Sequence, residues 1–169
     1  MKKQSAGILL YKKTETNIEV LLAHPGGPYW AKKDSGSWSI PKGEFEDSEQ
    51  PLDAAKREFS EELGMILPEG ELHALGEVKQ KSGKVIYAWA SEADLDVTTV
   101  KSNSFEVEWP PKSGQMQQFP EVDKVAWFSL KAALKKIVPG QAVFLERLAE
   151  KHGITVTNPV DTHEQTTLF

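Results

Sequence analysis

The sequence predicts an α/β domain in which helices pack against a mixed sheet, and three observations support this class. Short apolar runs typical of strands lie on both sides of one strong helix pattern, and further helix patterns close the chain. With 169 residues, 39% hydrophobic and 27% charged, the chain can bury the core of one domain. We expect that domain to span residues 1–153. Residues 154–169 carry no periodic pattern and should form a loose C-terminal tail.

The first forty residues predict two strands and a long loop. Residues 5–11 (SAGILLY) and 19–24 (EVLLAH) are apolar runs separated by polar residues, which favours paired strands. Residues 25–36 combine Gly and Pro with two aromatic and two lysine side chains, so they predict a loop. Residues 38–40 should be extended because a residue before Pro avoids the helical region.

The strongest helix pattern covers residues 47–63. Asp47 or Ser48 can cap its start, and Gly64 can end it in a left-handed conformation. At about 100° per residue, one face is apolar: Leu52, Ala55, Phe59 and Leu63.

The second half of the chain predicts a hairpin, an irregular segment, a strand and two helices. In order, these are strands at 72–79 and 84–91, an irregular segment at 94–120 with a possible strand at 105–109, a strand at 125–128, and helices at 130–137 and 139–151.

Composition and charge exclude several classes of function. The chain has no Cys, so disulfides, thiolate catalysis and Cys-ligated metal sites are ruled out. Its net charge of −5 argues against binding to duplex nucleic acid. Neither an apolar export signal nor an apolar stretch of membrane-spanning length is present, so we expect a cytoplasmic protein without a membrane partner. The oligomeric state has no signature in the sequence.

Three glutamates on the predicted helix carry the clearest chemical signal. Glu61, Glu58 and Glu62 fall at about 180°, 240° and 280° from Leu52, which places one acidic stripe roughly opposite the apolar face. Like charges at this spacing repel one another unless a cation neutralises them. Carboxylate oxygens are the ligands that Mg²⁺ and Mn²⁺ prefer, and such ions suit substrates with phosphate chains. A solvated acidic helix face is the alternative.

The complete spacing resembles the box of the Nudix hydrolase family. Residues 43–65 match Gly, five residues, Glu, seven residues, Arg-Glu, an apolar residue, any residue, Glu-Glu, any residue, Gly and an apolar residue. The two apolar positions hold the bulky Phe59 and Met65. The resemblance implies an α/β/α sandwich with a catalytic loop–helix–loop. It also implies hydrolysis of a phosphoanhydride in a nucleoside diphosphate linked to another group, by attack of water on phosphorus with two or three Mg²⁺ or Mn²⁺ ions.

The same resemblance assigns roles to single residues. It implies metal ligands at Glu58, Glu61, Glu62 and the Gly43 carbonyl. Arg57 would orient a glutamate, either Glu61 or Glu49, and Glu58 is the first candidate for the general base. Many members add a late acidic ligand before a Trp-containing strand. Here Glu121 is the candidate, with Glu106, Glu108 and a solvated loop carboxylate as alternatives.

The loop before the box predicts a substrate site. Pro41-Lys42-Gly43 resembles the version found in hydrolases of dinucleoside polyphosphates and, in some members, of inositol pyrophosphates. Lys42 would place a cation near the phosphates. Tyr29 and Trp30 could stack a base, and Lys32 and Lys33 could bind phosphate, although the aromatic side chains could instead anchor the loop. Trp38 is predicted in the core.

We therefore expect a nucleoside polyphosphate as the substrate, with dinucleoside polyphosphates first. The alternatives are a Nudix-fold nucleotide sensor without hydrolysis, a non-hydrolytic branch such as an isomerase, and a hydrolase of a base-free substrate such as an inositol pyrophosphate.

Overall fold

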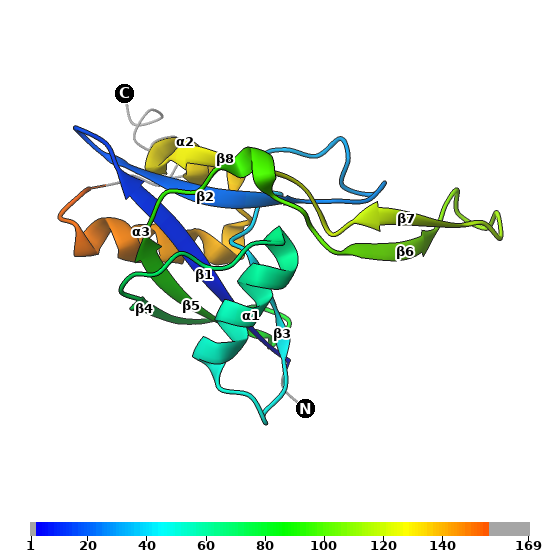
Figure 1. Cartoon of the computed structure of the whole chain (residues 1–169), viewed down its shortest axis with the longest axis horizontal. Coiled ribbons are helices and arrows are strands. Elements are labelled where there is room, and N and C mark those ends of the chain that lie inside the picture. Colours follow the sequence, from blue (N-terminus) through cyan, green and yellow to red (C-terminus); the bar gives the residue numbers. More distant parts are fainter. Residues whose placement is uncertain (1–2, 156–169) are drawn as a thin grey trace, which may run out of the picture.

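The computed structural model describes residues 3–155, and its centre is a mixed six-stranded sheet (Figure 1). Five strands follow the order β4-β5-β1-β2-β8, and β3 pairs with β1. Their bounds are β1 Gln4–Lys13, β2 Ile18–Pro25, β3 Lys42–Phe45, β4 His73–Lys79, β5 Val85–Glu92 and β8 Val122–Ser129. The β1–β5 pair is parallel and the other pairs are antiparallel. The predicted mixed sheet is confirmed.

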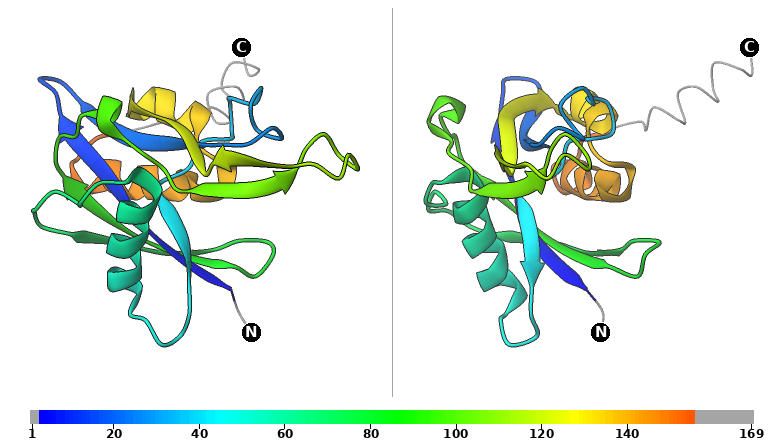
Figure 2. Two further views of the ribbon diagram at one scale, coloured as in Figure 1. Left: turned by 45° about the vertical axis from the view of Figure 1, so that its right-hand side comes forward. Right: turned by 90° about the vertical axis from the view of Figure 1, so that its right-hand side faces the viewer.

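Helices cover both faces of this sheet. The helices are α1 Pro51–Leu63, α2 Leu130–Lys136 and α3 Ala142–Lys151, with single 3₁₀ turns at η1 Val97–Thr99 and η2 Pro139–Gln141. Figure 2 shows α1 on one side of the sheet and α2 with α3 on the other. The α/β/α sandwich implied by the resemblance is therefore present. None of the helices in residues 3–155 combines the length and the apolar character that a membrane crossing needs.

Alternation along β1 divides the core into two halves. Successive strand residues point to opposite faces, so Ala6, Ile8 and Leu10 pack with α1 while Leu9 and Tyr11 pack beneath α2 and α3. Phe59 and Phe144 are the largest fully buried side chains, one in each half. Trp38 joins the second half at 4% exposure, as predicted.

The start of the box is a short strand that the sequence pattern does not predict. In β3, Lys42 pairs with Gly7 and Gly43 pairs with Ala6. Only one β3 residue, Phe45, is buried, so the strand lacks the apolar alternation that identifies β1 and β2. Its pairing fixes residues 42 and 43 against the central strand and beside α1.

A second difference is a two-stranded arm in the segment predicted to be irregular. The strands β6 (Ser104–Glu108) and β7 (Met116–Pro120) are antiparallel. Ser104 pairs with Pro120 at one end and Glu108 pairs with Met116 at the other. Figure 1 shows this arm projecting away from the sandwich. The possible strand at 105–109 was correctly placed to within one residue, but its partner was missed.

Helix boundaries also differ from the prediction. α1 begins at Pro51 after Gln50, with no side-chain cap, so neither Asp47 nor Ser48 caps it. Asp47 instead accepts a hydrogen bond from Gln4 Nε2 at 2.6 Å. The last predicted helix is split into η2 and α3, whereas Ser129 does cap α2 through the Ala132 N–H. The proposed limit at residue 153 stays a prediction, because residues 156–169 of the predicted tail lie outside the described residues.

Candidate active site

The predicted loop–helix–loop brings the box residues to one end of the sheet. β3 leads through residues 46–50 into α1, and Gly64 ends the helix with φ 65°, the left-handed conformation expected there. Gly43 faces the middle of the helix. A Cβ at Gly43 would overlap the Glu58 carboxylate, so the absence of a side chain at Gly43 is what allows Glu58 to lie against β3.

Arg57 connects three of the box carboxylates. Its Nε and Nη2 donate to the two oxygens of Glu49 at 2.9 and 2.8 Å, which is a bidentate pair. Its Nη1 donates to Glu58 at 2.8 Å and to Glu61 at 3.1 Å. These hydrogen bonds raise the pKa of Arg57 above its usual range, and the same bidentate pair lowers the pKa of Glu49. Both predicted partners, Glu49 and Glu61, are therefore in contact with Arg57.

Glu62 is held separately, by the backbone of β3. Its Oε2 accepts the Lys42 N–H at 3.1 Å. Burial raises the pKa of Glu62 to about 8, against the opposing effect of this hydrogen bond. Burial also raises the pKa of Glu58 and lowers that of Lys42.

The acidic stripe is therefore less exposed than the helical periodicity predicts. The Glu58 side chain is 13% exposed, whereas Glu61 retains 45%. The reason is β3, which packs along the flank of α1 and covers Glu58 and Glu62. Of the three glutamates in the stripe, Glu61 alone is exposed.

A cleft of about 310 Å³ opens beside these carboxylates. It brings together Trp30, Lys42, Glu62 and Glu121, which are four of the residues singled out from the sequence. The remaining lining combines apolar and uncharged polar residues: Ala23, Pro25, Ser37, Ser39, Ile40, Gln80, Val122, Val138 and Gln141. A flat aromatic ring, a lysine and two carboxylates thus share one concave surface.

Among the late acidic residues, Glu121 alone lines this cleft. After burial, which is the main cause, the negative charge of Glu121 adds to raising the pKa of Glu58 and Glu62. Asp123 instead contacts His24. Glu106 and Glu108 lie on the arm, where the Glu108 carboxylate accepts the Lys112 N–H.

Sequence reasoning missed the role of His24, which it treated as a strand end. His24 is fully buried, with Nδ1 at 2.7 Å from an Asp123 oxygen and Nε2 at 2.6 Å from the Lys33 carbonyl oxygen. The two contacts link the end of β2 to β8 and to the loop at residues 25–36, which is the predicted substrate loop. The available signal was a single histidine after the apolar run of residues 20–23, which does not identify partners nine and 99 residues away.

The substrate loop is fixed by polar contacts and not by its exposed aromatic side chains. Asp34 accepts from Trp38 Nε1 at 2.8 Å and forms an ion pair with Lys136, and the Gly36 N–H donates to the Lys135 carbonyl oxygen at 3.1 Å. Tyr29 and Trp30 remain 57% and 40% exposed. The alternative that these two side chains anchor the loop by burial is therefore wrong.

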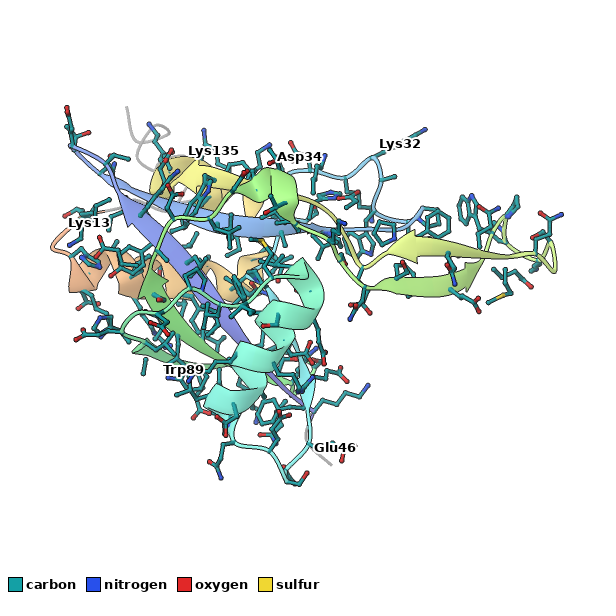
Figure 3. All side chains as sticks on the ribbon, viewed as in Figure 1. Lys13, Lys32, Asp34, Glu46, Trp89 and Lys135 are labelled. Carbon is teal, nitrogen blue, oxygen red and sulfur yellow. The ribbon has the colours of Figure 1, made fainter. Side chains whose placement is uncertain are left out.

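The loop lysines do not line the cleft. The Lys33 ammonium lies 4.9 Å from the centre of the Trp30 ring, a cation–π distance. Figure 3 shows Lys32 pointing outward from the loop. Tyr29 lies outside the cleft as well, with its ring edge against Trp109.

The donor set fits a hard divalent cation. The Glu58, Glu61, Glu62 and Glu121 carboxylates and the Gly43 carbonyl are oxygen donors of the kind that Mg²⁺ and Mn²⁺ take. Within residues 3–155, no three acidic or imidazole groups converge on one point, because Arg57 holds Glu58 and Glu61 while the Lys42 N–H holds Glu62.

Solved structures with this fold come from several organisms. An Ap4A hydrolase from C. elegans, as a binary complex, has a TM-score of 0.61 and 20% identity over 88% of this chain and 98% of its own. The NUDIX domain of Shewanella oneidensis NrtR, complexed with ADP ribose, has a TM-score of 0.59 and 15% identity over 90% and 89%. The Nudix hydrolase RenU from M. smegmatis has a TM-score of 0.57 and 23% identity over 93% and 90%.

No curated protein has a significant sequence match to this chain. A family model does match: the NUDIX domain covers residues 1–148, which includes the complete box and the cleft. The chain therefore belongs to the NUDIX family, and the enzyme class predicted from its box, that of a pyrophosphohydrolase, is confirmed.

Proposed function

We propose that the protein is a divalent-metal-dependent hydrolase of nucleoside polyphosphates, with dinucleoside polyphosphates as its first substrate class. The observation that carries this proposal is the shared cleft of Trp30, Lys42, Glu62 and Glu121. An aromatic ring suits a base, a lysine suits a phosphate chain, and the carboxylates suit the cations that such a chain requires.

The proposed metal ligands are Glu58, Glu61, Glu62, Glu121 and the Gly43 carbonyl, for two or three Mg²⁺ or Mn²⁺ ions. When bound, these ions supply neutralisation of the phosphate charge and polarisation of the phosphorus–oxygen bonds. Arg57 acts as the positioning residue, since its fixed planar group sets the directions of three carboxylates at once. Glu58, held in place by Arg57, is the proposed general base that accepts the proton of the attacking water.

The substrate class follows from the cation and the ring in the cleft. Lys42 would add a positive charge beside the phosphate chain, and Trp30 would stack a base, with Lys33 packed against the same ring. The similarity to an Ap4A hydrolase and to a NUDIX domain complexed with ADP ribose supports a nucleotide ligand. Free nucleotides and Mg²⁺ meet in the cytoplasm, which is where we propose that the protein works.

A substrate panel with and without Mg²⁺ or Mn²⁺ tests this function. The panel should contain diadenosine polyphosphates, nucleotide sugars, dinucleotide cofactors, oxidised nucleoside triphosphates and an inositol pyrophosphate. We expect cation-dependent release of nucleotides, fastest with a diadenosine polyphosphate. Preference for the inositol pyrophosphate would overturn the nucleotide assignment, whereas tight binding of a nucleotide without turnover would favour a sensor.

A further inference from the structure

The β6–β7 arm has one polar face and one apolar face. Phe105, Val107 and Trp109 alternate with exposed residues along β6 and are each half-buried. Phe119 lies opposite Phe105 on β7, with the two ring centres 6.3 Å apart. The two glutamates of β6 fall on the other face, because neighbouring strand residues point to opposite sides. The apolar face is therefore free of carboxylates from this strand.

The substrate loop lies against that apolar face. The Gly26 N–H donates to the Glu121 carbonyl at 2.9 Å, at the base of the arm. A Cβ at Gly27 would come within 2.7 Å of the Phe105 ring. Further along, the Tyr29 and Trp109 rings meet edge to face, with centres 5.3 Å apart and planes at 79°. The loop therefore follows the arm outward from Gly26, at its base, to Tyr29.

These contacts place three aromatic side chains in sequence from the cleft outward. Trp30 lines the cleft, Tyr29 is the adjacent residue, and Trp109 contacts Tyr29 on the arm. Tyr29 keeps 57% of its surface exposed. The loop is also held by hydrogen bonds of His24 and Asp34, so its attachment does not depend on the Tyr29 ring alone. Five strand steps separate Ser104 at the base from Trp109, or roughly 16 Å at the usual rise.

We propose that Tyr29 and Trp109 form a second base-binding platform, which takes the distal nucleoside of a dinucleoside polyphosphate. This proposal rests on the proposed function. Flat aromatic faces stack any base, and a ligand that contacts both Trp30 in the cleft and the Tyr29–Trp109 pair outside it must carry two bases on one connector. The charges fit, since the loop carries Lys32 and Lys33 and the carboxylates of β6 lie on the opposite face of the arm.

The test compares two substrates that share a phosphate chain: diadenosine tetraphosphate and adenosine 5′-tetraphosphate, which lacks the second nucleoside. Stacking contributes roughly 1–3 kcal/mol per base, so Trp109→Ala should raise KM for the dinucleotide by about 5- to 150-fold. KM for the mononucleotide should not change. Met116→Ala, an exposed change on the other face of the arm, is the matched control and should alter neither KM.

Two further variants distinguish loss of the base-binding platform from misfolding of the arm. Tyr29→Ala, which leaves the arm sequence intact, should give the same substrate-selective loss, and Trp109→Phe should restore most of the affinity. Equal loss on both substrates, or no loss on the dinucleotide, overturns the platform. A change in sedimentation coefficient on Trp109→Ala would instead identify the arm as an interface between copies and also overturn it. If the wild-type protein hydrolyses neither compound, the proposed function itself fails.

Discussion

The two ends of the proposed site are built in different ways. At the box, the two glutamates that β3 covers each have a defined hydrogen-bond donor. Arg57 donates to Glu58, and the Lys42 N–H donates to Glu62. At the loop, Tyr29 and Trp30 remain exposed, and Tyr29 meets the half-buried Trp109 of the arm edge to face. The contrast is that the box carboxylates are held by hydrogen bonds within the protein, whereas the surfaces proposed for the base remain open to solvent.

The largest effect should come from the box. Glu58→Gln and Glu62→Gln should each lower kcat by at least about 100-fold, because each removes a charge that holds cations or accepts a proton. Asp53→Asn, at an exposed position in the first turn of the same helix, is the matched control and should stay near wild type. Steady-state kinetics at saturating Mg²⁺ measures the difference. Near-normal turnover in both Gln variants would move the catalytic centre away from the box.

The next effect concerns the open end of the site. Trp30→Ala should raise KM for a nucleotide substrate by about 5- to 150-fold, the range expected for the loss of one stacked base. kcat should change less, since ground-state and transition-state binding fall together. A base-free inositol pyrophosphate is the control substrate, and its KM should not respond. A large fall in kcat on both compounds would show that Trp30 shapes the catalytic residues and does not stack a base.

These two ends also differ in how far the sequence predicts them. The box residues all lie on one helix or on the segments directly before and after it. Their spacing in the sequence is therefore enough to predict that Glu58 and Arg57 lie on the same helix. Periodicity also identifies β1, β2, α1 and the β4–β5 hairpin, since each has a regular apolar pattern. The Arg57 contact to Glu49 could be expected for the same reason: both residues belong to a single loop–helix–loop.

What the sequence does not predict depends on contacts between distant segments. β3 has little apolar character and exists through its pairing with β1, so both the strand and its burial of Glu62 were missed. His24 meets Asp123 across 99 residues, which no local pattern encodes. The arm was missed because β7 is exposed at four of its five positions and has no apolar alternation, and its strand character comes from pairing with β6.

Two acidic residues at the base of the arm offer a finer comparison. Glu121→Gln removes a proposed oxygen ligand, so the Mg²⁺ concentration for half-maximal activity should rise by about tenfold. Asp123→Asn should leave that concentration nearly unchanged and lower the thermal stability instead, because it weakens the contact with buried His24. Mg²⁺ titrations of activity and melting curves for both variants separate the two roles. Equal, small shifts in both titrations would return Glu121 to a solvated carboxylate.

The smallest effect concerns stability without metal. Burial raises the pKa of Glu62 to about 8 from an ordinary value of 4.5, so folding favours its protonated form. As pH rises, the unfolded chain releases this proton first, and the folded state loses stability progressively between these two pKa values.

Glu62→Gln has no proton to lose and keeps an oxygen for the Lys42 N–H. In EDTA, its melting temperature should match wild type near pH 4 and exceed it at pH 9, by about 2–4 °C for each kcal/mol gained. Mg²⁺ should then raise the wild-type melting temperature more than that of the variant. A difference independent of pH would show that the change acts through packing and not through the charge of Glu62.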